Sequence, residues 1–205
     1  MHWSERMKNI VVGITGASGS IYGLRLVEEL LCAEQQVTLL LSNAGRQVLA
    51  FETGLQLAED TKECLAQLRK HFGADDRLSH YTLSDFFAPI ASGSSAPQAV
   101  VICPCSMGTV GRIAAGLSDN LLERVADVAL KERRQLLLVP RETPFNQIHL
   151  GNLLRLSQAG AQILPAMPAF YQKPQSIDEL VDFVVGKILD SLGVEHQLFR
   201  RWGVE

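Results

Sequence analysis

The chain alternates short apolar runs with longer stretches in which apolar residues recur at helical spacing. The short runs are nearly continuous in hydrophobicity, as in strands that are buried on both faces of a sheet. They predict strands at Asn9–Ile14, Val37–Ser42, Ala99–Pro104, Leu136–Pro140 and Gln162–Ala166. The longer stretches predict helices at Ile21–Ala33, Ala44–Phe51, Lys62–Phe72, Met107–Ala115, Asn120–Arg133, Asn146–Ala159 and Ser176–Leu192. The last helix opens with Ser176 and Glu179 at the spacing of a capping box.

Strands that alternate with helices indicate right-handed βαβ units. We therefore predict a three-layer α/β fold, Rossmann-like or flavodoxin-like, with a doubly wound parallel sheet. With 205 residues, 47% of them hydrophobic, the chain has the size and composition of one domain with a sizeable core. We expect a single domain over residues 1–205, with residues 1–7 as a flexible N-terminal extension.

Charge and cysteine content narrow the possible partners and the compartment. A net charge of −3 gives no reason to expect nucleic acid or an anionic membrane as a partner. No apolar run approaches the roughly 18 residues of a membrane span, and the N-terminus lacks the apolar segment of a signal peptide. The four cysteines do not form a disulfide framework and are expected to be reduced thiols. These features predict a cytoplasmic location.

Small, polar and charged residues follow the predicted strands. In doubly wound sheets ligands bind beyond the carboxyl ends of the strands. The segments at those ends are Thr15–Ser20, Ser42–Asn43, Cys103–Thr109, Arg141–Asn146 and Pro165–Tyr171. We therefore expect the functional site at this edge of the sheet.

The segment after the first predicted strand, GITGASGSIYG, carries glycines at positions 13, 16 and 19. Such a loop before a helix can cradle a phosphate, although a simple tight turn gives the same pattern. A dinucleotide site requires an acidic residue at the end of the second strand, for the adenosine ribose. Here Ser42 and Asn43 stand at that end, and the chain has no Tyr-x-x-x-Lys pair. The pattern therefore favours a mononucleotide.

Two further groups of charged residues have both a structural and a functional interpretation. Arg124, Asp127 and Lys131 share one stripe of the helix predicted at Asn120–Arg133. The stripe is either a solvated ion-pair face or a pair of cations about 10 Å apart that could bind a phosphate. Arg141 and Glu142 directly follow a buried strand, where they could bind a ligand or pair with each other.

The sequence gives little support to a metal site. Cys103 and Cys105 lack a second Cys or His pair at ligand spacing, and the five histidines are scattered. The small residues of CPCSMGTVGR fit close packing against a flat ligand or against a neighbouring strand. We expect no bound metal.

Several motifs together resemble one known family. From about residue 8 to the C-terminus, in order, the chain reads TGASGSIYGLRL, AFETG, ASGSSAP, ICPCSMGT, ERVADVALKERR, VPRETPF, PAFYQKPQS and FRRWG. This series resembles the UbiX-type flavin prenyltransferases of the ubiquinone pathway. The resemblance implies a flavodoxin-like FMN-binding flavoprotein domain and a homododecamer with active sites at subunit interfaces.

The resemblance also implies a reaction. Members join a dimethylallyl group, delivered as dimethylallyl monophosphate, to N5 and then C6 of reduced FMN, without a metal. The prenylated FMN then serves a UbiD-type decarboxylase. The resemblance thus implies two small-molecule substrates and one protein that receives the product.

The family motifs carry over to individual residues of this chain. The FMN-binding residues implied are Gly16, Ala17, Ser18, Ser42, Ser106, Met107, Gly108, Thr109 and Arg141. The catalytic residues implied are Ser18 near the flavin N5, Glu52 and Glu142 as proton carriers, and Lys131. The substrate-phosphate residues implied are Arg124, Lys131, Tyr171 and Lys187, with the Gly93–Ser94 loop closing over them.

The chain differs from the family pattern at two positions. Lys187 stands where relatives often have Arg. The lysine keeps the positive charge but cannot make the bidentate hydrogen bonds of a guanidinium. Phe86 stands where some relatives have Trp. Phe86 and Trp202 are candidate walls for the prenyl group.

Two other functions remain as alternatives. The first is an FMN-dependent decarboxylase of the homo-oligomeric flavin-containing cysteine decarboxylase type, and the second is a non-catalytic FMN carrier. ICPCSMGT differs from the Pro-Ala-Ser-Ala-Asn-Thr of those decarboxylases, and a carrier needs no proton relay.

Overall fold

The computed structural model describes residues 8–201 and residue 203. The predicted extension at residues 1–7 and the candidate Trp202 lie outside the described residues. The strands are β1 (Asn9–Ile14), β2 (Gln36–Leu41), β3 (Leu78–His80), β4 (Ala99–Cys105), β5 (Gln135–Pro140) and β6 (Gln162–Ile163). The α-helices are α1 (Ser20–Cys32), α2 (Asn43–Thr53), α3 (Thr61–Phe72), α4 (Met107–Ala114), α5 (Leu121–Lys131), α6 (Gln147–Gln158) and α7 (Ile177–Leu192). Short 3-10 helices lie at Pro89–Ala91 and Gly93–Ser95.

The strands form one parallel sheet in the order β3-β2-β1-β4-β5-β6. This is the strand order of a Rossmann-type sheet. β1 pairs with β2 along its whole length, from Asn9 opposite Gln36 to Ile14 opposite Leu41. On its other side β1 pairs with β4, so the direction of winding changes between these two strands. The carboxyl ends of β1 and β4 therefore form the topological switch point.

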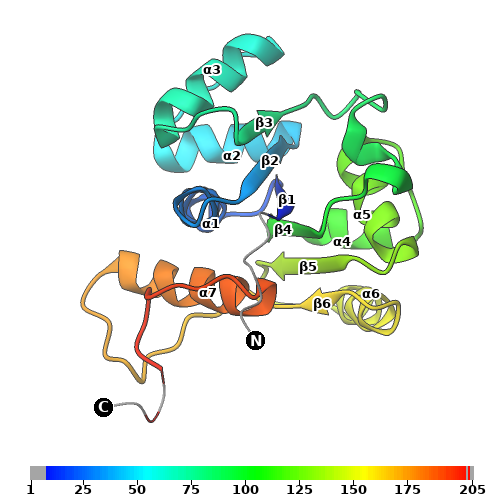
Figure 1. The fold of residues 1–205 in the computed structure, drawn as a ribbon. Coiled ribbons are helices and arrows are strands. Elements are labelled where there is room, and N and C mark those ends of the chain that lie inside the picture. The colour runs from blue at the N-terminus through cyan, green and yellow to red at the C-terminus, as the bar shows by residue number, and fades with distance from the viewer. Residues whose placement is uncertain (1–7, 202, 204–205) are drawn as a thin grey trace, which may run out of the picture.

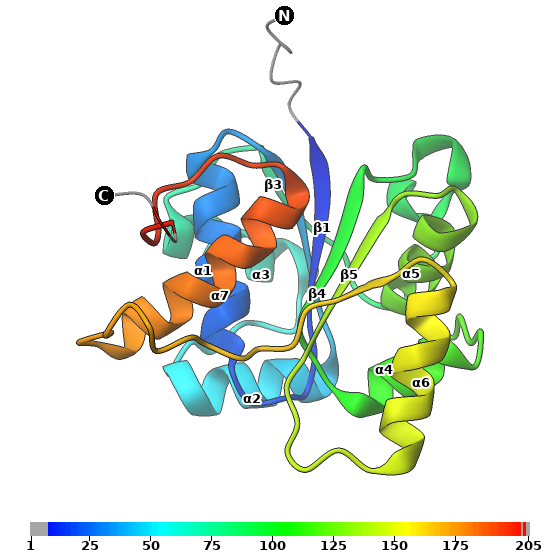
Figure 2. The ribbon, with the colours of Figure 1, turned by 90° about the horizontal axis from the view of Figure 1, so that it is seen from below.

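Helices cover both faces of the sheet (Figures 1 and 2). α1, α3 and α7 pack on one face, and α4, α5 and α6 pack on the other. In β1, Ile10 and Val12 enter the first core, whereas Val11 enters the second. Because both faces are covered, β1 has no polar side chain from Ile10 to Ile14. The predicted three-layer fold with a doubly wound parallel sheet is confirmed.

Three details differ from the sequence-based expectation. β3 was not predicted, because its three residues, LSH, are too few and too polar to read as a buried strand. β6 spans Gln162–Ile163 and is shorter than expected. At α7 the Ser176 hydroxyl accepts from Glu179 N at 3.2 Å, whereas the Glu179 carboxylate accepts from Gln175 N at 2.8 Å. Half of the predicted capping box is therefore present.

Gly45 allows α2 to start directly against β1. A methyl carbon at Gly45 would lie 2.4 Å from the Ile14 carbonyl oxygen, which is backbone and cannot swing away. We expect Gly45→Ala to lower the free energy of unfolding by about 2 kcal/mol, as for an overpacked core. Urea unfolding measures this change.

Gly151 in α6 supplies the matched control, because a methyl carbon there meets no atom within 4 Å. Gly151→Ala should leave the free energy of unfolding unchanged or raise it by up to about 1 kcal/mol, the helix propensity difference. Equal effects of the two substitutions would contradict the close contact at Gly45.

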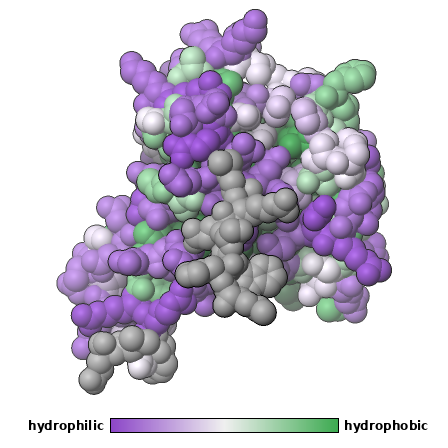
Figure 3. Space-filling model, viewed as in Figure 1, coloured by the Kyte–Doolittle hydropathy of each residue, from purple (hydrophilic) through white to green (hydrophobic). Residues whose placement is uncertain are grey.

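The surface carries few continuous apolar areas on the face drawn in Figure 3, where hydrophilic residues dominate and hydrophobic ones are scattered. Within residues 8–201 and 203, no helix has both the length and the hydropathy needed to cross a membrane. Large exposed apolar side chains nevertheless occur, among them Phe51, Phe87, Ile148, Phe170 and Ile177.

Candidate active site

The loops at the switch point are joined by Thr15. Its hydroxyl donates to the Pro104 carbonyl oxygen at 2.8 Å and accepts from Ser106 N at 2.8 Å. The side chain is only 1% exposed. Thr15 therefore fixes the loop after β1 against the loop after β4, at the place where doubly wound sheets bind ligands. The sequence analysis assigned it no role, because a threonine after a strand carries no distinctive signal.

Three helices begin at this edge of the sheet, after the neighbouring strands β2, β1 and β4. Ser42 caps α2 by accepting from Gly45 N at 2.9 Å. Ser106 caps α4 by accepting from Thr109 N at 3.3 Å, and the two hydroxyls lie 3.0 Å apart. Free N–H groups and the positive ends of helix dipoles gather here, which suits a phosphate. The structure thus places the implied FMN residues Ser42, Ser106 and Thr109 at the starts of α2 and α4.

The glycine loop packs closely against the start of α2. A methyl carbon at Gly16 would lie 2.6 Å from the Ala44 side chain. Ala17 is buried and Ser18 is exposed. Gly19, the residue before α1, has a φ of 105°, a left-handed value that favours glycine. The loop is held close to α2 and leaves the Ser18 side chain accessible.

Glu52, near the end of α2, reaches the start of α1. Its carboxylate accepts from Ser20 N at 2.8 Å and from Gly19 N at 3.0 and 3.1 Å. Partial burial favours the neutral acid, but hydrogen bonds from the Ser18 hydroxyl and from the Ser20 and Gly19 backbone outweigh it and lower the pKa of Glu52. Glu52 is therefore a carboxylate at neutral pH, in contact with Ser18 and able to accept a proton.

Arg141 and Glu142, after β5, complete this edge of the sheet. Arg141 Nε donates to the Ser18 carbonyl oxygen at 3.0 Å, which ties the β5 loop to the glycine loop. Glu142 accepts from Thr143 N at 3.0 Å. The ion pairs among the described residues do not include one between Arg141 and Glu142. Arg141 is thus next to Ser18, the residue that Glu52 also contacts.

Lys131 and Arg124 lie on α5, on the α4–α6 face. Arg124 pairs with Asp127 at 2.9 Å and donates to the Ala91 carbonyl oxygen at 3.1 Å. Lys131 is the last residue of α5, pairs with Glu132 and is 45% exposed. α5 runs antiparallel to β5, which begins only four residues later, so Lys131 lies at the amino edge of the sheet. Within one chain it is remote from Ser18, Glu52 and Arg141.

The loop of residues 93–95 lies against Lys131. A methyl carbon at Gly93 would come within 2.6 Å of Lys131 Nζ. The expected neighbourhood of Lys131, Arg124 and the Gly93–Ser94 loop is therefore present, but it stands away from the switch point.

Tyr171 and Lys187 lie on the opposite face of the sheet, with α7. The Tyr171 ring packs edge-on against Phe183, with centroids 5.9 Å apart. Phe183 and Lys187 are one helical turn apart and share a face of α7. One chain therefore divides the four implied phosphate residues into two pairs on opposite faces. A single site that contains all four needs more than one copy of the chain.

Phe86, the candidate prenyl wall, is 44% exposed. Among the described residues, no group of three or more His, Cys, Asp or Glu side chains is placed to hold a metal ion. Burial raises the pKa of the Cys103 and Cys105 thiols far above their usual range, so both stay protonated.

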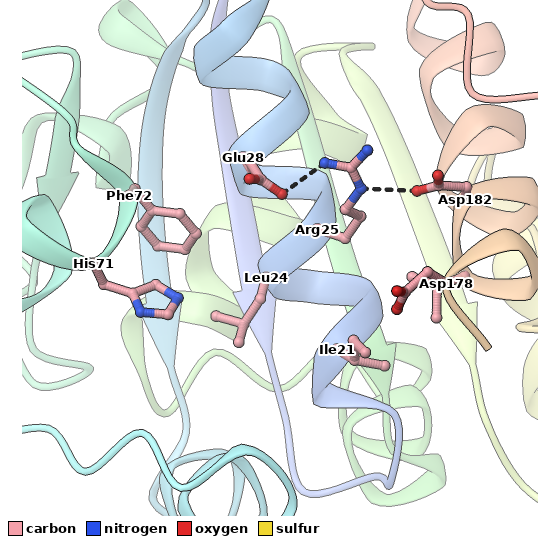
Figure 4. Close-up of a pocket in the computed structure, with 9 residues that line it drawn as sticks. Ile21, Leu24, Arg25, Glu28, His71, Phe72, Asp178 and Asp182 are labelled. Atoms are coloured by element: carbon pink, nitrogen blue, oxygen red, sulfur yellow. Dashed lines mark hydrogen bonds and ion pairs between the residues drawn. The ribbon is translucent and has the colours of Figure 1, made fainter. Parts of the chain in front are cut away.

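A groove of about 540 Å³ lies between α1, α7 and the end of α3 (Figure 4). Arg25 crosses it and pairs with Asp182 at 2.8 Å and with Glu28 at 2.6 Å. The groove contains none of the predicted site residues. Its charged groups join α1 to α7, and we assign it a structural role.

Comparison with known proteins identifies the family. The Flavoprotein family model matches residues 2–189. A flavin prenyltransferase UbiX from Halalkalibacterium halodurans is 55% identical over 195 residues, which cover 95% of this chain and 93% of the relative. The chain belongs to the UbiX flavin prenyltransferase family. The predicted family and the class of enzyme, a transferase, are thereby confirmed.

Solved structures of UbiX-type proteins share the fold. The crystal structure of AnUbiX (PadA1) in complex with FMN and dimethylallyl pyrophosphate has a TM-score of 0.87 and 37% identity, and covers 98% of this chain and 100% of that one. A dodecameric FMN-dependent Ubix-like decarboxylase from Escherichia coli O157:H7 has a TM-score of 0.83 and 38% identity, with 96% and 100% covered. The three-layer fold is therefore that of the UbiX family.

Proposed function

We propose that this protein transfers a dimethylallyl group from dimethylallyl monophosphate to N5 and then C6 of reduced FMN. The observation that carries the proposal is the contact of the ionised Glu52 with Ser18, beside Arg141, where three helices begin. AnUbiX, a relative of known structure, was crystallised with FMN and dimethylallyl pyrophosphate. The residue roles below are part of this proposal.

FMN lies at the switch point in this proposal. Its phosphate and ribityl chain are held by Ser42, Ser106 and Thr109. The backbone of Met107 and Gly108, at the start of α4, also contributes. Gly16, Ala17 and Ser18 contact the isoalloxazine, and Arg141 reaches it from β5. Glu52 accepts the proton that C6 loses, because it is ionised and close to Ser18.

Departure of the prenyl phosphate is assisted by cations and donors rather than by a metal. Lys131, Lys187, Arg124 and the Tyr171 hydroxyl surround the phosphate oxygens as negative charge develops on them. Glu142 relays a proton to the leaving phosphate. Phe86 shields the prenyl group from water.

The site requires an assembly of several copies. Lys131 and Tyr171 lie on opposite faces of one chain, so a neighbouring copy must supply part of the cluster. The E. coli relative is dodecameric, and this chain exposes Phe51 to 90% and Phe87 to 100%. We place the active sites of a homododecamer at its subunit interfaces. The prenylated FMN passes to a UbiD-type decarboxylase in the cytoplasm.

Mass spectrometry of the flavin tests the reaction. Incubation of the purified protein with reduced FMN and dimethylallyl monophosphate should give a flavin heavier by one C5H8 unit. A parallel reaction with the diphosphate identifies the preferred donor, and one with a chelator tests independence from metals. The name of the E. coli relative describes a decarboxylase. FMN recovered without any adduct would contradict the transferase and favour a decarboxylase or an FMN carrier.

A further inference from the structure

The residues after α7 fold back along that helix, close to Lys187. Figure 1 shows this segment, in red, beside α7. The Phe199 ring lies 5.2 Å from Phe183 and 5.2 Å from His196, between centroids. Gly186 makes room for it, because a methyl carbon there would lie 2.4 Å from Phe199 and 2.7 Å from His196. Residues 194–201 are thus packed on the face of α7 that carries Lys187.

Asp190 holds this segment by its carboxylate. Arg201 donates from Nη2 to Oδ1 at 2.7 Å and from Nη1 to Oδ2 at 3.3 Å, a two-pronged pairing. His196 Nε2 lies 3.1 Å from Oδ1, and its Nδ1 accepts from Leu198 N at 3.2 Å, so Nε2 carries the hydrogen. Partial burial opposes the charge, but these hydrogen bonds outweigh it and lower the pKa of Asp190. Asp190 is therefore charged at neutral pH.

Lys187 is the second cationic neighbour of Asp190, after Arg201, and it is held loosely. Lys187 Nζ lies 3.8 Å from Oδ2, beyond hydrogen-bond distance, and the lysine side chain is 50% exposed. The guanidinium of Arg201 matches the two carboxylate oxygens better than an ammonium does. Asp190 is thus already neutralised by Arg201, and the Lys187 ammonium keeps its hydrogens for another acceptor.

We propose that Arg201 is a positioning residue of the prenyl-phosphate site: by pairing with Asp190 it keeps the Lys187 ammonium available to the substrate phosphate. Without Arg201, Asp190 would draw Lys187 into a direct ion pair, and the phosphate would have to compete with that carboxylate. The inference rests on the proposed function, in which Lys187 and Tyr171 bind the phosphate. Gln172 connects the same segment to Tyr171, since its Nε2 donates to the Arg200 carbonyl oxygen at 2.7 Å.

The test measures the KM for dimethylallyl monophosphate and the Kd for FMN in the full-length assembled protein. Arg201→Ala should raise the KM about fivefold, the upper range for one exposed ion pair, and leave the FMN Kd within about twofold. Arg201→Gln, which keeps the length of the side chain, should do the same and serves if the alanine variant fails to assemble. Arg200→Ala removes the same charge one residue away and should leave the KM unchanged.

The double variant Asp190→Asn/Arg201→Ala distinguishes competition by the Asp190 carboxylate from other effects of losing Arg201. Removal of the competing carboxylate should return the KM to within about twofold of the unmodified protein. A KM that stays as high as in Arg201→Ala would overturn the inference, because a mere tether of the C-terminal segment or a direct contact of Arg201 with phosphate predicts no recovery. An unchanged KM in Arg201→Ala would overturn it as well. Absence of prenylated flavin from the unmodified protein would instead contradict the proposed function.

Discussion

Lys131→Ala is expected to reduce prenyl transfer by about 10²–10³-fold, the cost of one group that stabilises charge in a transition state. The ammonium neutralises the departing phosphate, and no metal takes its place in the proposed mechanism. Because the proposed contact of Lys131 is with the prenyl phosphate and not with the flavin, the Kd for FMN should change by less than about twofold. Single-turnover formation of prenylated flavin and an FMN titration measure the two quantities.

Two further measurements make the Lys131 prediction specific. Lys70→Ala removes a lysine of α3 and should leave turnover unchanged. Assemblies that mix Lys131→Ala subunits with Ser18→Ala subunits should recover activity, because some interfaces then combine an intact Ser18 with an intact lysine from the neighbouring copy. Equal loss of turnover and FMN binding in Lys131→Ala would show that the lysine is structural. Mixed assemblies without activity would contradict its action across an interface.

Glu52→Gln should lower the rate of complete prenylation by about 10²–10³-fold, the usual contribution of a general base. The amide preserves the size of the side chain but cannot take up the proton that C6 loses. The KM for dimethylallyl monophosphate should be unaffected, since the proposed phosphate residues lie elsewhere. Quenched-flow samples analysed by mass and absorbance would follow the adduct and the finished product.

The control for Glu52 is Glu63→Gln, in the first turn of α3, which should leave turnover unchanged. Glu52 also accepts from Gly19 N and Ser20 N, so its replacement could loosen the start of α1. A Kd for FMN that rises as much as the rate falls would mean that Glu52 shapes the loop and does not carry a proton. An unchanged rate would exclude proton transfer by Glu52.

The apolar pattern predicted most of the fold, because a sheet covered on both faces needs continuous apolar strands. It failed at β3, a strand of three residues in which the polar His80 is buried along with Leu78. Strand ends likewise predicted the edge where Ser18, Ser42 and Arg141 meet.

The sequence did not predict how the cationic residues are divided between the faces. Helical spacing placed Lys131 on the same stripe as Arg124. The edge of the sheet at which Lys131 lies depends on the direction of that helix relative to the strands, which the spacing does not give. The ion pairs of Asp190 were also not predicted, because the partner Arg201 comes from a C-terminal segment without helical or strand periodicity.

Because Lys131 lies at the amino edge of the sheet, activity should depend on the concentration of the protein. In the proposed assembly, a chain that takes a lysine from a neighbour into its reaction centre is chemically incomplete when alone. Dilution that separates the copies would then lower activity, and renewed association would restore it. Abundance, rather than stability alone, would set the output of such a protein in a cell.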